Sequence, residues 1–324
     1  MRLLTVQYRK TVDFDALQAA GFDAVSYNVP IGGTSGLRAM LDGAHARGMR
    51  LAAWIAFGVD ATLVKQWPGP GGMLDFSQEA ARVAIARAVS ELVQQFPDLD
   101  MFALDYMRYY TTTDNAALQA SYSGYITDAV EKIAEAAEDK TIIAHVKAYE
   151  RDWLRWCQNW PQWLDEGLIE FAAPMCYQPL STRYGGFTRH AQAWLWVADQ
   201  ERILPTLSIV DTTVSGEPLK TVETIMQEIR YMADTLGYTD LAFFDNRMTA
   251  AQMAAIVAAL PEDEPETIDV RAEIAALRGM LADARDMLCA GETWVHTWSE
   301  QVRANLAKME TQIAAIEEKI ETAD

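Results

Sequence analysis

The chain has 324 residues, and its 27 Lys and Arg against 46 Asp and Glu give a formal net charge of −19 at pH 7. This balance argues against nucleic-acid binding, because a protein that neutralises phosphates needs a basic face. Half of the residues are hydrophobic, which suits a large core and excludes a disordered chain.

Eight short apolar runs, rich in β-branched and aromatic residues, recur in the first 260 residues, each followed by a stretch of helical periodicity. The runs are 3–8, 24–29, 51–57, 101–106, 141–146, 171–177, 203–210 and 241–244. The amphipathic segments between them include 35–48, 78–95, 116–137, 153–166 and 221–237. Alternating strands and helices pair in parallel through right-handed crossovers, and eight units in about 250 residues predict an α/β fold, the closed (β/α)8 TIM barrel.

The rival fold is a doubly wound open sheet. That sheet usually carries a glycine-rich phosphate turn after its first strand, whereas residues 7–15 read QYRKTVDFD. We therefore expect one barrel domain over residues 1–260.

Residues 261–324 differ sharply in composition from the barrel. The segment 261–267, PEDEPET, holds four acids and two prolines and predicts an extended, solvated linker. Residues 268–324 contain no Pro, and their apolar residues follow coiled-coil spacing with one phase shift near Gly291. This tail is either a helical hairpin or one bent helix. It either folds back onto the barrel or joins copies of the chain as a dimer or trimer.

The chain shows no signal for membrane insertion, secretion or metal binding. It has no run of about 18 uncharged apolar residues, and Gln7 and Arg9 interrupt any apolar signal-peptide core. Its three cysteines, Cys157, Cys176 and Cys289, form no CxxC pair and are expected to be reduced core residues. The histidines lack metal-site spacing, so we expect no metal and no cofactor.

The active site of such a barrel lies at the carboxyl ends of the strands. There Asp105 lies at the end of the apolar strand 101–106. Burying a carboxylate costs free energy, so we expect it to have a function or a charged partner. Small Ala103, on the same strand face, leaves room beneath it inside the barrel. Asp105 is therefore the leading catalytic candidate. The alternative is an ion pair with Arg108 that only pins a loop.

Two stretches resemble a known group of enzymes. Residues 100–110, DMFALDYMRYY, resemble the strand-four signature DGIHxDYIRYP of bacterial family 10-like glycoside hydrolases and, more remotely, that of family 18 chitinases. Residues 163–177, WLDEGLIEFAAPMCY, resemble the segment WxxxGLIDFxAPMxY of the same group. The signature's Gly and His are Met101 and Ala103 here, and its Pro is Tyr110. Met107 occupies the position nearest the chitinase general-acid Glu, so the resemblance does not extend to substrate-assisted chemistry.

The resemblance implies hydrolysis of a glycosidic bond in a polysaccharide or oligosaccharide, which requires two carboxyl groups. One protonates the leaving oxygen, and the other attacks the anomeric carbon or activates water. We expect Asp105 to be one of them. For the other we rank Asp245, after the eighth strand, ahead of Asp211 and Glu150.

Further side chains near the strand ends suit sugar rings and hydroxyls. The candidates for substrate binding are Tyr8, Asn28, Trp54, Arg108, Tyr109, His145, Lys147, Glu150, Tyr177 and Asp211. His145 and Lys147 share one strand face, which either points inward as two cationic donors or outward against helices. Trp153, Trp156, Trp160 and Trp163 fall at helical spacing and predict a single stripe, either core or sugar platform.

Two functions therefore compete: a glycoside hydrolase centred on Asp105, and a glycan-binding barrel that does not cleave and is assembled through its tail. The sequence shows no signal peptide, so for either function we expect the protein in the cytoplasm or on a phage virion. Nucleic acid and membrane are not expected partners.

Overall fold

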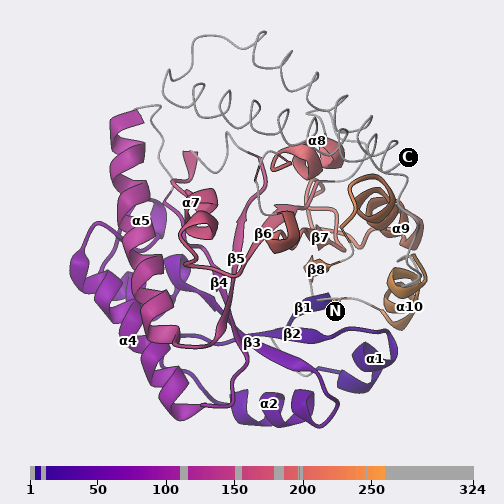
Figure 1. The fold of residues 1–324 in the computed structure, drawn as a ribbon, viewed down its shortest axis with the longest axis horizontal. Helices are drawn as coiled ribbons and strands as arrows, with labels where there is room; N and C mark the ends of the chain where they lie inside the picture. Colours follow the sequence, from indigo (N-terminus) through magenta and orange to yellow (C-terminus); the bar gives the residue numbers. More distant parts are fainter. Residues whose placement is uncertain are drawn as a thin grey trace, which may run out of the picture. The chain divides into compact units, whose positions relative to one another are not determined.

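Eight parallel strands, neighbours in chain order, close into a barrel in the computed structural model (Figure 1). The residues described are 4–8, 12–109, 116–149, 155–178, 186–195, 197, 200–238, 240–244, 247 and 249–259. The strands are β1 Leu4–Tyr8, β2 Ala24–Asn28, β3 Arg50–Ala56, β4 Met101–Asp105, β5 Thr141–Lys147, β6 Phe171–Cys176, β7 Thr206–Ser208 and β8 Leu241–Phe244. β1 pairs with β8, from Leu4 opposite Leu241 to Val6 opposite Phe243, and this closure confirms the predicted TIM barrel over an open sheet.

The connecting helices surround the ring of strands (Figure 1). The α-helices are α1 Phe14–Ala19, α2 Leu37–His45, α3 Ala61–Gln66, α4 Glu79–Gln95, α5 Ala116–Ala137, α7 Trp160–Asp165, α8 Gly186–Gln192, α9 Val222–Arg230 and α10 Ala250–Ala259. Single turns of 3-10 helix are η1 Phe57–Val59, η2 Pro70–Gly72 and η3 Gln200–Arg202, and η4 Tyr231–Thr235 is a π-helical turn that extends α9.

Two elements differ from the prediction. β7 is shorter than the predicted run 203–210, because Pro205 has no N–H for the ladder and Ile203 makes only an isolated bridge to Ala172. The predicted continuous helix 153–166 was wrong: among its described residues Arg155 is helical, residues 156–159 are not, and α7 begins at Trp160. Cys157 has a φ of +56°, in the left-handed region, and Pro161 is tolerated only in the first helical turn.

Strand alternation builds two apolar layers. Mostly small side chains, with the single large indole of Trp54, fill the barrel interior: Ala24, Ala52, Trp54, Met101, Ala103, Ile143, Ala173, Leu204 and Ala242. Larger residues of the opposite strand faces pack against the helices in a second, more extensive cluster. Trp160 and Trp163 belong to this outer core, and Cys157 and Cys176 are buried there as free thiols.

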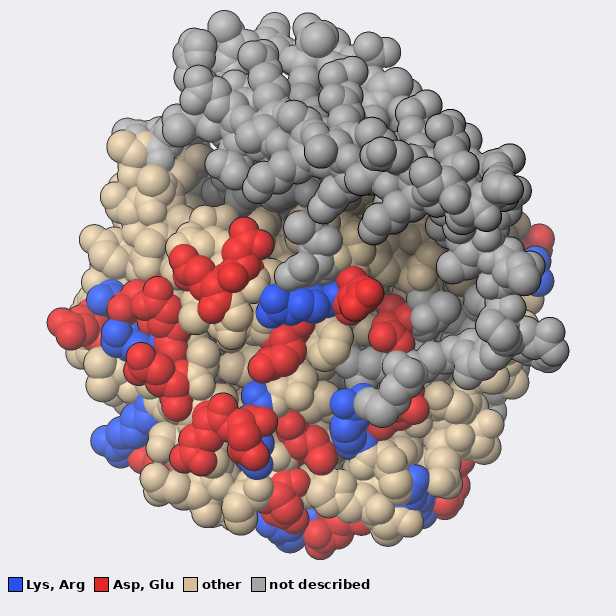
Figure 2. All heavy atoms as spheres, viewed as in Figure 1, with Lys and Arg blue, Asp and Glu red and all other residues tan. Residues whose placement is uncertain are grey.

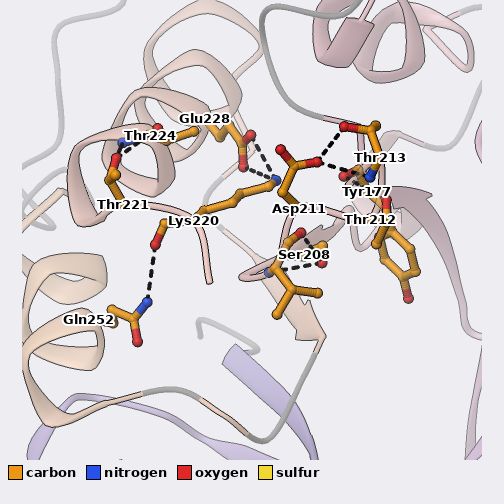
Figure 3. Close-up of polar contacts among 11 residues, drawn as sticks. Tyr177, Ser208, Asp211, Thr212, Thr213, Lys220, Thr221, Thr224, Glu228 and Gln252 are labelled. Carbon is orange, nitrogen blue, oxygen red and sulfur yellow. Dashed lines mark hydrogen bonds and ion pairs between the residues drawn. The ribbon is translucent and has the colours of Figure 1, made fainter. Parts of the chain in front are cut away.

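A buried ion pair joins α9 to the loop that follows β7. Lys220 Nζ donates to both carboxylate oxygens of Glu228 at 2.8 Å (Figure 3), and both side chains are fully buried. Burial raises the pKa of Glu228 to about 7, against the opposing attraction of Lys220. Removing one partner of such a pair costs about 3–5 kcal/mol, because the other charge is left buried and uncompensated. The pair therefore holds the loop after β7 against α9.

The chain divides into two units, Met1–Pro261 and Glu262–Asp324, and every described residue lies in the first. The predicted linker 261–267, the helical tail 268–324 and Cys289 lie outside the described residues. None of the described helices is both long and apolar enough to cross a membrane. On the face drawn in Figure 2, acidic and basic side chains are interspersed over the described surface, with acids in the majority.

Candidate active site

Asp105 is the only acidic residue in the eight described strands. It closes β4, and strand alternation places it on the inward face with Met101 and Ala103. Its side chain is 7% exposed. Trp54 Nε1 donates to Asp105 Oδ2 at 3.2 Å, and the backbone N–H of Tyr106 donates to Oδ1 at 2.7 Å. Both carboxylate oxygens are therefore held in one orientation at the barrel mouth.

The turn after β4 is strained. Tyr106 has a φ of +54°, a left-handed conformation that costs a non-glycine residue about 1–2 kcal/mol. Its carbonyl accepts a hydrogen bond at 2.8 Å from the N–H of Arg108, two residues on. Gly58 in η1 approaches so closely that a Cβ added there would overlap the Tyr106 carbonyl oxygen. This close approach helps to hold the turn, and with it the N–H that binds Asp105.

Arg108 does not pair with Asp105. The two side chains, both described, form no ion pair, which corrects the alternative that Asp105 serves only to pin a loop through Arg108. The guanidinium carbon of Arg108 instead lies 4.0 Å from the ring centroid of Tyr106 and 5.4 Å from that of Trp156. Arg108 is 6% exposed, and its Nε and Nη1 are buried without a hydrogen-bond partner among the described residues.

Alternate side chains of β5 face inward. Ile143 belongs to the inner core, so His145 and Lys147 share its face, and Leu104 pairs with Ala144, which puts Asp105 level with His145. Burial lowers the pKa of His145; the charge of Asp105 opposes this shift and that of Arg108 reinforces it. The imidazole is therefore neutral near pH 7. Lys147 Nζ lies 5.0 Å from the centroid of the Trp156 ring.

A buried glutamine holds the end of β5. The backbone N–H of Lys147 donates to Gln158 Oε1 at 2.9 Å, and Gln158 Nε2 donates to the carbonyl of His145 at 3.5 Å. Gln158 is fully buried. It therefore fixes the height at which His145 and Lys147 enter the site.

Two stacked aromatic rings lie at the ends of β6 and β8. Tyr177 and Phe244 are 5.1 Å apart between ring centroids, with 15° between their planes, and both are half-buried. Burial raises the pKa of the Tyr177 phenol, and the charge of Asp105 adds to this effect while Arg108 opposes it. Tyr177 is therefore a protonated hydrogen-bond donor. Because Asp105 and Arg108 act on both His145 and Tyr177, these four side chains form one electrostatic cluster.

Of three further predicted residues, Tyr109 and Asp211 make their contacts outside this cluster, and Asn28 lies beside Trp54. Tyr109 is buried against α5, stacked on Tyr122 at 4.1 Å between centroids. Asp211, in the loop after β7, accepts hydrogen bonds from the backbone N–H and hydroxyl of Thr213, and the hydroxyl contact is the main reason that its pKa is lowered (Figure 3). Asn28 Nδ2 donates to the carbonyl of Trp54 at 3.5 Å, beside Asp105's partner.

The remaining predicted residues, Asp245, Glu150 and the side chain of Tyr8, lie outside the described residues.

Two residues at the mouth escaped the sequence reasoning. Phe244 shares its strand face with inward Ala242, so the period of two could have identified it. The helical spacing predicts one stripe of Trp153, Trp156, Trp160 and Trp163, but the break at Cys157 separates Trp156 from the core that holds Trp160 and Trp163. Trp156 is half-buried and contacts Arg108 and Lys147.

No protein-family model and no curated protein matches the chain. Among solved structures, the glycoside hydrolase domain of PgaB (BpsB) from Bordetella bronchiseptica matches with a TM-score of 0.57 at 12% identity, covering 79% of this chain and 98% of that one. A GH18 chitinase from Pseudoalteromonas aurantia matches with a TM-score of 0.55 at 12% identity, covering 80% and 100%. The spore cortex-lytic enzyme SleL from Bacillus megaterium matches at 0.55 and 8% identity, covering 81% and 74%.

The chain shares its barrel fold with these enzymes. At 8% to 12% identity this likeness concerns the fold, and at that level it confirms the predicted remote resemblance to glycoside hydrolases, family 18 included. The chemistry of the site is therefore inferred from its own residues.

Replacing Gly58 by Ala tests the strained turn. The added methyl group would collide with the Tyr106 carbonyl, so we expect a loss of about 1–3 kcal/mol in the free energy of unfolding, measured by urea denaturation. Gly124→Ala in α5 is the matched control, because an added Cβ there meets nothing within 4 Å. The control should gain about 0.5–1 kcal/mol. Equal stability of Gly58→Ala and the wild-type chain would show that the close approach imposes no constraint.

Proposed function

We propose that this chain hydrolyses a glycosidic bond in a polysaccharide, with Asp105 as one of two catalytic carboxyl groups. The supporting observation is the position of Asp105: a single strand carboxylate at the barrel mouth, with each oxygen oriented by an N–H donor. The enzymes that share the fold include a chitinase and a glycoside hydrolase domain.

The mechanism needs a second carboxyl group on the other side of the scissile bond. We propose Asp245, which directly follows β8 and lies outside the described residues. The oxygens of Asp105 already accept N–H bonds, so their remaining lone pairs are available to the anomeric carbon or to a water. This geometry favours Asp105 as nucleophile or base, and we propose that Asp245 protonates the leaving oxygen.

The neutral groups around Asp105 suit sugar binding. A neutral His145 can donate and accept one hydrogen bond, and protonated Tyr177 donates one, which matches the hydroxyls of a sugar. The stacked rings of Tyr177 and Phe244 provide an apolar surface for a sugar face.

Asp105→Asn tests the enzymatic role. We expect at least about a 10³-fold loss in the release of reducing ends from a panel of bacterial polysaccharides, since the amide is neither a nucleophile nor a base. Asp139→Asn, an exposed carboxylate paired with Lys140, is the matched control and should keep full activity. Undiminished cleavage by Asp105→Asn would remove Asp105 from the mechanism.

The second candidate is a barrel that binds glycans without cleaving them. The specific observation in its favour is that Asp105 has no second carboxylate beside it within the described strands. In this case the wild-type chain would bind members of the panel and release no reducing ends.

We further propose that residues 268–324 join two or three copies of the chain and that the assembly is carried on a phage particle. The coiled-coil spacing of the apolar residues motivates the first part, and an assembled polysaccharide-directed barrel would suit the second. We expect sedimentation of the full chain to give the mass of a dimer or trimer. The mass of one protomer at micromolar concentration would contradict assembly.

A further inference from the structure

Arg108 is a buried cation that forms no ion pair with any residue the structure describes. It is 6% exposed, and among the described residues neither its Nε nor its Nη1 has an acceptor. Asp105, the nearest acidic candidate in sequence, instead binds Trp54 and Tyr106. A buried guanidinium without a counter-charge is unfavourable by several kcal/mol, and its contacts with aromatic faces offset only part of that.

A second cationic side chain, Lys147, lies close to Arg108. Lys147 Nζ and the Arg108 guanidinium lie 5.0 Å and 5.4 Å from the centroid of the same Trp156 ring. His145 and Tyr177 are uncharged near pH 7, so Asp105 is the single negative charge among the described side chains of this cluster.

We propose that Arg108 binds an oxyanion carried by the sugar, either the carboxylate of a uronic acid or a sulfate ester, and so selects acidic saccharides. The proposal rests on the proposed function, because it names the substrate class of the same site. A guanidinium presents planar N–H donors that match such oxyanions, and charge-assisted bonds of this kind are about twice as strong as neutral ones. The Tyr106 and Trp156 rings hold the group in place, which lowers the entropic cost of binding.

Binding by the full chain tests the proposal. Titration calorimetry would use glucuronate-containing, galacturonate-containing and sulfated tetrasaccharides, each beside a neutral counterpart with the acid reduced to an alcohol or the sulfate removed. We expect at least one acidic member to bind about 10-fold or more tightly than its counterpart, and Arg108→Met to abolish that difference. Preference for the uronates or for the sulfated member identifies the oxyanion. Arg87→Met, on the exposed face of α4, should change nothing.

Thermal unfolding separates ligand binding from a structural role. Arg108→Met removes an uncompensated buried charge, so its Tm should be no lower than that of the wild-type chain, whereas a structural Arg108 would lower the Tm when replaced. Arg108→Lys keeps the charge without the planar donors and should retain the preference for the acidic sugar at reduced affinity.

Four results would overturn the proposal: no binding of any acidic member, equal binding of acidic and neutral members, an undiminished preference in Arg108→Met, or no preference in Arg108→Lys. Because the assay measures binding, its failure is distinct from that of the proposed function. A chain that cleaves only neutral glycans would refute this inference alone, and one that binds acidic glycans without cleaving them would refute hydrolysis alone.

Discussion

The hydrogen bond from Trp54 to Asp105 links the architecture of the barrel to its chemistry. It requires β3 and β4 to pair so that Trp54 lies beside Ala103, a side chain small enough to admit an indole inside the barrel. It also requires the chain to turn sharply after Asp105, so that the N–H of Tyr106 reaches the other carboxylate oxygen. The left-handed conformation of Tyr106 is the local cost of that turn, and the packing of Gly58 against it helps to maintain it.

The separation of Asp105 from Arg108 determines the electrostatics of the barrel mouth. Were the two paired, the carboxylate would be occupied and the site would be a structural ion pair like Lys220 and Glu228, which satisfy each other completely. Instead, the carboxylate of Asp105 and the guanidinium of Arg108 each act electrostatically on His145 and Tyr177. Asp105 and Arg108 have opposite effects on the pKa values of His145 and Tyr177, while burial keeps both of these groups neutral. One negative and one positive group, each available, can act on different parts of a single ligand.

Period-two and helical patterns predicted the barrel and Asp105, because strands and helices repeat at fixed intervals and a carboxylate in an apolar strand breaks the pattern. Features that depend on single backbone conformations escaped prediction. The left-handed Cys157 separates Trp156 from the core tryptophans, and Pro205 shortens β7. Tyr109, beyond the end of β4, follows no strand period, and its stacking on Tyr122 depends on the helix that packs there. The distance between Asp105 and Arg108 could not be predicted either, since their spacing of three residues is compatible with a pair.

A double-mutant cycle on polysaccharide cleavage tests most directly whether Trp54 acts through Asp105. Trp54→Phe keeps the apolar ring and removes the indole N–H, so kcat/KM should fall about 10-fold in the wild-type background. In the Asp105→Asn background the same substitution should cost little more, because residues that act as one unit are not additive. Equal losses in both backgrounds would contradict the coupling and place Trp54 and Asp105 in separate roles.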